Sequence, residues 1–231
     1  SFYFFLVFCN FTLSFSQYIL NKKFTKNQSA FEIYRNLSKK NQNTVLKIPT
    51  NLYLNEEFKF YPLSGIKNSY TINCNELGFW SFYNSDKFGF NNNNEIYERD
   101  ISNLLLGDSF VHGSCVNEKD TISSNLNKSG LSTLNLGYSG NGPIRNLATY
   151  IEYGKQIDSI KNIFFFIYEN DYLDLKLEKK NKILNKYLVN PFFFSQNLIA
   201  NEIIVSNIKK KVFNKELDLA FKNNRYSMYD I

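Results

Sequence analysis

The feature that most constrains this chain is an alternation of short apolar runs with helical patterns between residues 101 and 168. The apolar runs at 101–106, 131–136 and 163–168 each have the length of a strand. The last of them, IFFFIY, has no polar alternation, which is typical of a sheet covered on both faces. Because helical patterns separate the strands, the region predicts a doubly wound parallel sheet.

Two helices are expected between these strands. The first begins at Asn117, has Asp120 in a capping box, and ends at Gly130. Pro143 opens the second, and apolar residues follow it at helical spacing as far as Ile157. We therefore expect residues 98–231 to form a flavodoxin-like α/β domain with three layers, α/β/α.

The residues before this domain, 21–97, are expected to form a small strand-rich appendage. Residues 24–60 show no clean period and predict helix or irregular structure. From Tyr61 the chain is rich in aromatic and turn residues, as in short strands joined by tight turns. The asparagine run at 91–94 predicts a loop that closes the appendage.

Residues 1–20 are expected to be either a signal peptide or a truncated membrane anchor. FYFFLVF, at residues 2–8, is apolar, but polar residues then interrupt the run, so it is too short for a confident span. Ser14 and Ser16 are spaced for cleavage before Gln17. Either interpretation exports the protein, with membrane attachment through the N-terminus in the second case, and places it in the periplasm, at the cell surface or on a bacterial membrane.

Export bears on the three cysteines. Cys9 belongs to the N-terminal segment, which leaves Cys74 and Cys115 as a pair in an oxidising compartment. We predict a disulfide between them, and the alternative is two unrelated buried thiols.

The net charge of +6 does not by itself predict a nucleic-acid partner. The lysines are scattered, and their densest runs, at 179–182 and 209–211, are interpreted as solvated helix faces or loops. No motif that reads nucleic acid accompanies the charge, so none is expected to bind.

Glycine and polar residues follow each of the three predicted strands of the sheet. Ligands of such sheets bind beyond the carboxyl ends of the strands, so these loops should converge. Each loop alone is also typical of an ordinary turn, but together they supply an exposed serine and several amide donors, as acyl transfer requires. The loops are Gly107-Asp108-Ser109, residues 135–142 (NLGYSGNG) and Glu169-Asn170-Asp171.

The blocks GDSF, NLGYSGNGP and END resemble the first three blocks of the SGNH (GDSL-type) esterase and lipase superfamily. SDKFGF and LATYIEY, which flank them, are similar to bacterial surface-polysaccharide-associated members. The resemblance covers about residues 70–175. It implies that Ser109 is the nucleophile and that its amide, the Gly140 amide and the Asn170 side chain form the oxyanion hole, with no cofactor and no metal. Supporting positions implied by the same blocks are Asp108, Gly137 and Asp171.

The chain departs from this family at two points. Glu169 stands where the third block usually has glycine. The family takes its base from an Asp-x-x-His near the C-terminus, but no histidine follows Asp174, and the spacing from Asp218 ends in Phe221. We therefore expect the α/β domain to be incomplete at its C-terminus, with the histidine block beyond Ile231.

His112 is the only histidine in the chain and lies three residues after Ser109. Residues three apart on a helix share a face, so the imidazole could reach toward the hydroxyl. A base also needs an orienting acid and an approach from the side of the leaving group. We interpret His112 as a packing or hydrogen-bonding residue beneath the first loop.

The sequence thus predicts a serine esterase or acyltransferase for ester-linked acyl groups of a carbohydrate or lipid. Without the histidine block, this 231-residue chain is expected to be inactive. An alternative is a non-catalytic SGNH-fold module for binding or assembling cell-surface glycan. A phosphate or nucleotide binder ranks last, because the chain has neither a Gly-x-x-x-x-Gly-Lys signature nor an acidic metal pair.

Overall fold

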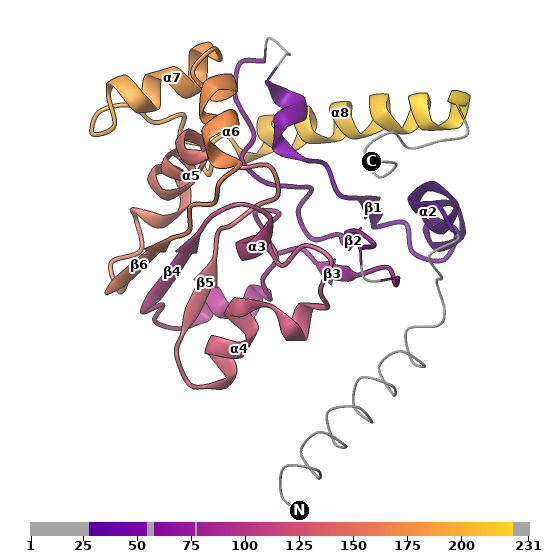
Figure 1. Cartoon of the computed structure of the whole chain (residues 1–231), viewed down its shortest axis with the longest axis horizontal. Helices are drawn as coiled ribbons and strands as arrows, with labels where there is room; N and C mark the ends of the chain where they lie inside the picture. Colours follow the sequence, from indigo (N-terminus) through magenta and orange to yellow (C-terminus); the bar gives the residue numbers. More distant parts are fainter. Residues whose placement is uncertain (1–27, 55–57, 77, 224–231) are drawn as a thin grey trace, which may run out of the picture.

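The computed structural model describes residues 28–54, 58–76 and 78–223, which contain two three-stranded sheets (Figure 1). The predicted signal peptide or anchor and Cys9 lie outside the described residues. Within these residues, no helix has both the length and the apolar character needed to cross a membrane.

The sheet that carries the candidate site is entirely parallel. It contains β4 (Asn103–Leu106), β5 (Thr133–Asn135) and β6 (Asn162–Phe165), in the order β5-β4-β6 (Figure 1). The predicted parallel α/β arrangement is therefore confirmed for these strands, with the first strand in the centre. Each strand is shorter than the apolar run that predicted it, because the β4–β5 pairing extends over three residues and the β4–β6 pairing over four.

The connection from β4 to β5 differs from the prediction of one helix starting at Asn117. Thr121 is the N-cap of the main helix, and its Oγ1 accepts a hydrogen bond from the Ser124 amide at 3.2 Å. The residues before Thr121 form a separate 3₁₀ turn, so the predicted helix start is wrong. Gly130 follows the helix with φ of +82°, as expected at a helix end. In order, the elements are α3 (Ser109–His112), η3 (Glu118–Asp120) and α4 (Ile122–Lys128).

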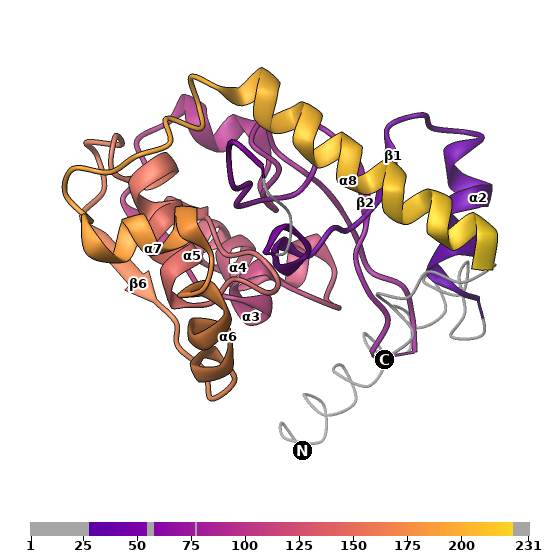
Figure 2. The ribbon, with the colours of Figure 1, turned by 90° about the horizontal axis from the view of Figure 1, so that it is seen from above.

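The connection from β5 to β6 begins with proline, as predicted. Pro143 occupies the first turn of α5 (Pro143–Thr149), and one turn of π-helix, η4 (Tyr150–Gly154), continues it. Two further helices follow β6 and pack beside α5 in both views (Figures 1 and 2). They are α6 (Asp171–Glu178) and α7 (Lys182–Val189).

The two edges of this sheet differ. All four residues of β6 are exposed, including Phe164 at 46% and Phe165 at 41%, so the expectation of cover on both faces is wrong for this strand. The opposite edge is occupied by Asn92, whose Nδ2 donates to the Asn135 carbonyl at 2.8 Å and whose Oδ1 accepts from the Asn135 amide at 2.9 Å. The β5 edge is therefore satisfied by a side chain, and no described strand pairs with the outer side of β6.

The N-terminal sheet joins β1 (Thr44–Leu46), β2 (Tyr70–Ile72) and β3 (Phe82–Asn84). β2 and β3 form the predicted short antiparallel strands. β1 is parallel to β2 and lies within residues 24–60, so the prediction of helix or irregular structure misses this strand. Before β1 comes α2 (Ala30–Ser38), and 3₁₀ turns follow β1 and β3 as η1 (Thr50–Tyr53) and η2 (Asn94–Glu98).

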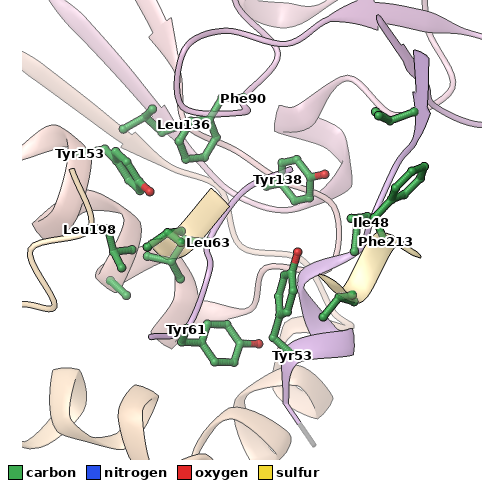
Figure 3. Close-up of a cluster of buried hydrophobic side chains, with 14 of the residues drawn as sticks. Ile48, Tyr53, Tyr61, Leu63, Phe90, Leu136, Tyr138, Tyr153, Leu198 and Phe213 are labelled. Carbon is green, nitrogen blue, oxygen red and sulfur yellow. The ribbon is translucent and has the colours of Figure 1, made fainter. Parts of the chain in front are cut away.

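One hydrophobic cluster joins the two sheets. Figure 3 shows Tyr53, Tyr61 and Leu63 from the N-terminal region beside Leu136 and Tyr138, which follow β5. The long helix α8 (Glu202–Asn223) runs from the α5–α7 side of the molecule to α2 and covers this cluster (Figures 1 and 2). The core is therefore continuous across residue 97.

The predicted pairing of Cys74 and Cys115 is present as a disulfide with a Cα–Cα distance of 4.9 Å. It ties the β2–β3 connection to the segment after α3 and spans 41 positions of sequence. The same two segments also meet through the Asn73 side chain, whose Nδ2 donates to the Gly113 carbonyl at 3.1 Å. The appendage is thus covalently linked to the segment that directly follows α3, the helix that begins with Ser109.

We expect the variant Cys74→Ala/Cys115→Ala to lose about 4 kcal/mol of unfolding free energy, because the open chain regains the entropy of a loop of this length. Urea denaturation of the oxidised protein and the variant measures the difference. Cys9→Ala is the matched control and should match the wild type in the same assay. Equal denaturation midpoints for wild type and double variant would show that the bridge does not contribute to stability.

Candidate functional site

The first loop places Ser109 at the N-terminus of α3. Asp108 is the helix N-cap, and its Oδ1 accepts a hydrogen bond from the Phe110 amide at 3.2 Å. A Cβ at Gly107 would lie 2.5 Å from the Val111 side chain, and one at Gly137 would lie 2.4 Å from it. Two loops therefore close on Val111, and the absence of side chains at these glycines permits that approach.

The first and third loops meet at Asp108. Its Oδ2 accepts hydrogen bonds from the Ser109 hydroxyl at 3.3 Å and from the Asn170 Nδ2 at 3.4 Å. Because both atoms lie within hydrogen-bond reach of one oxygen, they are no more than about 7 Å apart. The convergence predicted for Ser109 and Asn170 is therefore present. Asp108 is buried, whereas Ser109 is half-buried and Asn170 exposed, so solvent reaches the site from the Asn170 side.

The second loop reaches this edge of the sheet beside the third. A Cβ at Gly142 would lie 2.5 Å from the Cβ of Asp174 on α6, so the loop packs directly against that helix. Gly140 has φ of +82° and is half-buried, and the atoms nearest to a Cβ there belong to Pro49, Thr50 and Asn51. Gly140 is thus bordered by the N-terminal region.

A buried carboxylate holds the second loop to α6. Glu178 Oε1 accepts from the Gly142 amide at 2.9 Å, and Oε2 accepts from the Ile144 amide at 2.7 Å. Arg145 donates its Nε to Oε1 at 2.5 Å, and both side chains are fully buried. The negative charge lies at the N-terminus of α5, where the backbone amides and helix dipole stabilise it.

The N-terminal region completes this network. Thr50 Oγ1 donates to Asn141 Oδ1 at 2.6 Å and accepts from Arg145 at 3.2 Å. Sequence reasoning missed Arg145, Glu178 and Thr50. One signal was present: Asp174 and Glu178 are four residues apart on one helix and therefore share a face. Nothing local pointed to their partner.

His112 is fully buried and belongs to a second polar cluster. Its Nδ1 lies 2.8 Å from the Ser139 hydroxyl. The same hydroxyl accepts a hydrogen bond from the Lys47 ammonium at 3.3 Å and lies 2.5 Å from the Ser114 hydroxyl. Burial, followed by the charge of Lys47, holds the pKa of His112 well below its usual value. Among the described residues, no side-chain hydrogen bond joins His112 to Ser109, so the interpretation of His112 as a packing and hydrogen-bonding residue is confirmed.

The carboxyls of the third loop differ in their surroundings. Asp171 Oδ2 accepts a hydrogen bond from the Tyr168 amide at 2.6 Å, while Asp171 Oδ1 has no hydrogen-bond partner in the described structure. Burial raises the pKa of Asp171, and burial likewise raises that of Asp174. Within the described ranges no group of three or more His, Cys, Asp and Glu side chains could hold a metal ion.

The chemistry available here is that of a serine hydroxyl at a helix N-terminus with an amide side chain beside it. In this geometry the Asn170 amide and the Ser109 hydroxyl both bind Asp108, so a substrate oxygen would have to compete with Asp108 for the amide. The structure places no basic nitrogen of the described residues at Ser109. Asp108 is the ionisable side chain that contacts the hydroxyl.

We expect Glu178→Gln to lower the unfolding free energy by about 3 kcal/mol, because it leaves the buried Arg145 charge with only the longer ion pair to Asp174. Asp174→Asn is the matched control. It removes a longer contact, 3.5 Å from Arg145, at a side chain that is partly exposed, so a loss below about 1 kcal/mol is expected. Urea denaturation measures both. Similar losses in the two variants would contradict a dominant role for Glu178.

Comparisons of the chain with models of protein families, with curated proteins and with solved structures found no significant match.

Proposed function

We propose that this protein is a serine esterase or acyltransferase that acts on ester-linked acyl groups of a carbohydrate or lipid. One observation carries the proposal: the Ser109 hydroxyl and the Asn170 amide, from loops 61 positions apart, share one carboxylate oxygen at the carboxyl edge of a parallel sheet. A nucleophile and an oxyanion donor must lie within such a distance of each other.

In the proposed reaction, Ser109 Oγ attacks the ester carbonyl and forms an acyl-enzyme with loss of the alcohol. The Ser109 and Gly140 amides and the Asn170 side chain hold the negative charge that develops on the carbonyl oxygen. Water, or the hydroxyl of an acceptor, then attacks the acyl group and releases Ser109. A base must take the serine proton in the first step, and we do not assign this role to His112, because its Nδ1 faces Ser139 and its buried Nε2 makes no hydrogen bond to Ser109.

We further propose that the sheet continues beyond β6 as a doubly wound, three-layer fold. Parallel sheets have helices on both faces, yet β6 and the following residues Phe166, Ile167 and Tyr168 are exposed. A strand and a helix added at this edge would bury these side chains. The added segment would lie beside the third loop, where a base could approach Ser109.

Apolar side chains at the rim of the site support an acyl or sugar substrate. Phe110 and Tyr168 are exposed, with ring centroids 5.2 Å apart, and each is near a proposed catalytic residue in sequence. Exposed aromatic rings of this kind bind acyl chains or the apolar faces of sugars. Export is supported by the Cys74–Cys115 disulfide, which persists in oxidising compartments.

The second candidate is a non-catalytic module that binds surface glycan. The observation that favours it is that the Ser109 hydroxyl and the Asn170 amide both donate hydrogen bonds to Asp108. Neither group is then free to act on a substrate. Under this alternative the rim of the site would bind an acylated glycan without cleaving it.

Imidazole added in solution should accelerate labelling of the chain by a fluorophosphonate probe, because it can accept the proton of the Ser109 hydroxyl. Ser109→Ala should abolish the labelling, and Asn170→Ala should slow it by about 10²-fold through loss of an oxyanion donor. Ser129→Ala, which changes an exposed serine at the C-cap of α4, is the control and should label normally. An unlabelled wild type that still binds acylated glycan would favour the non-catalytic module.

The variant His112→Gln should label at the wild-type rate without added imidazole, since His112 bonds to Ser139 rather than to Ser109. Circular dichroism confirms that the variant is folded. Loss of labelling in a folded His112→Gln protein would identify His112 as the base and overturn the assignment made here.

A further inference from the structure

The helix α8 presents a long, rigid outer face, which we define as its exposed residues between Ile203 and Lys222. The opposite face is anchored in the core through Val205, Val212 and Ala220. Lys209, also on the buried face, donates to the Ser64 hydroxyl at 2.8 Å and to the Phe88 carbonyl at 3.1 Å. The outer face is therefore fixed in place, and no part of it has to fold on binding.

The outer face is strongly basic. It carries four lysines and a single carboxylate, Asp218, so its formal charge is +3. A shallow hollow on this side of the helix is lined by these charged groups together with Asn207, Asn214 and Leu219. The four lysines are Lys210, Lys211, Lys215 and Lys222.

Apolar side chains flank the lysines at both ends of the helix. Ile203 is 78% exposed and Ile204 is 43% exposed at the start, and Phe221 is 53% exposed near the end. The helix rises about 1.5 Å per residue, so Ile203 and Phe221 are separated by about 27 Å, with three of the four lysines between them and Lys222 directly after Phe221. Figure 2 shows α8 along the outside of the molecule, with α2 beside its C-terminal end, where the ring centroids of Phe221 and Phe31 are 4.7 Å apart.

We propose that the outer face of α8 docks on the surface of an anionic phospholipid membrane. The basic groups match the phosphate-bearing surface, and the apolar groups at the two ends match the boundary between headgroups and acyl chains. Exposed isoleucine and phenylalanine favour a lipid surface over an acidic polysaccharide or a nucleic acid, since neither of these offers an apolar layer. This docking is independent of the proposed acyl-transfer chemistry.

Binding of the full chain to phosphatidylcholine vesicles with and without phosphatidylglycerol, at about 30 mol %, tests the proposal by co-sedimentation. Three net charges should raise the partition coefficient on anionic vesicles roughly a hundredfold over neutral ones at low salt, and added salt should reduce the gain. Partition onto neutral vesicles is the baseline for every variant. Equal binding of the wild type to both vesicles would overturn the proposal.

Lys210→Glu/Lys211→Glu/Lys222→Glu should remove the preference for anionic vesicles. Lys161→Glu/Lys179→Glu/Lys180→Glu has the same net charge and changes exposed lysines elsewhere, so it should keep most of the preference. Ile203→Ser should weaken binding severalfold at unchanged charge. If both triple variants lose the preference equally, net charge rather than α8 drives binding and the proposal fails. Binding to polygalacturonate, with none to vesicles, would also overturn it.

Discussion

The candidate site depends on the buried carboxylate of Glu178. This group accepts hydrogen bonds from backbone amides at the start of α5 and forms an ion pair with Arg145. The glycine loop after β5 is therefore held against α6, which carries Glu178. A buried charge is costly without partners, and here several donors and an opposite charge compensate it. Any rearrangement of the loop would remove hydrogen-bond donors from the buried Glu178 carboxylate. This cost explains how a segment rich in glycine keeps a fixed position.

The N-terminal region is part of the site's scaffold. Thr50 bonds Asn141 and Arg145, Lys47 reaches Ser139, and Asn92 closes the outer edge of β5. Its aromatic side chains also share the core with the segment after β5 (Figure 3). The region therefore does more than append strands, because it supplies polar partners to three residues of the second strand-end loop, Asn135, Ser139 and Asn141.

The buried cluster around His112 shows why proximity in sequence does not define a catalytic pair. Lys47 is nearly fully buried, and burial lowers its pKa to about 8, with Glu76 acting in the opposite direction. Burial of the imidazole, followed by the charge of Lys47, holds the pKa of His112 well below its usual value. The imidazole is bonded to Ser139 through Nδ1, and its buried Nε2 makes no hydrogen bond to Ser109, so three positions of separation in sequence do not bring the two side chains into contact.

The sequence by itself determined the alternation of strands and helices, the proline that opens α5, the cysteine pair and the strand-end residues Ser109 and Asn170. These depend on local periodicity, on turn chemistry and on the rule that parallel strands end at one edge. Only the tertiary structure decided that Asp108 bonds both Ser109 and Asn170, and that His112 bonds Ser139. It also decided that Asn92 occupies the β5 edge while β6 stays exposed. The bonds from Glu178 to the glycine loop are a third result of this kind. Most of these contacts connect residues 27 to 62 positions apart. Local patterns cannot specify such pairs, because burial and partner choice are set only when separate segments pack together.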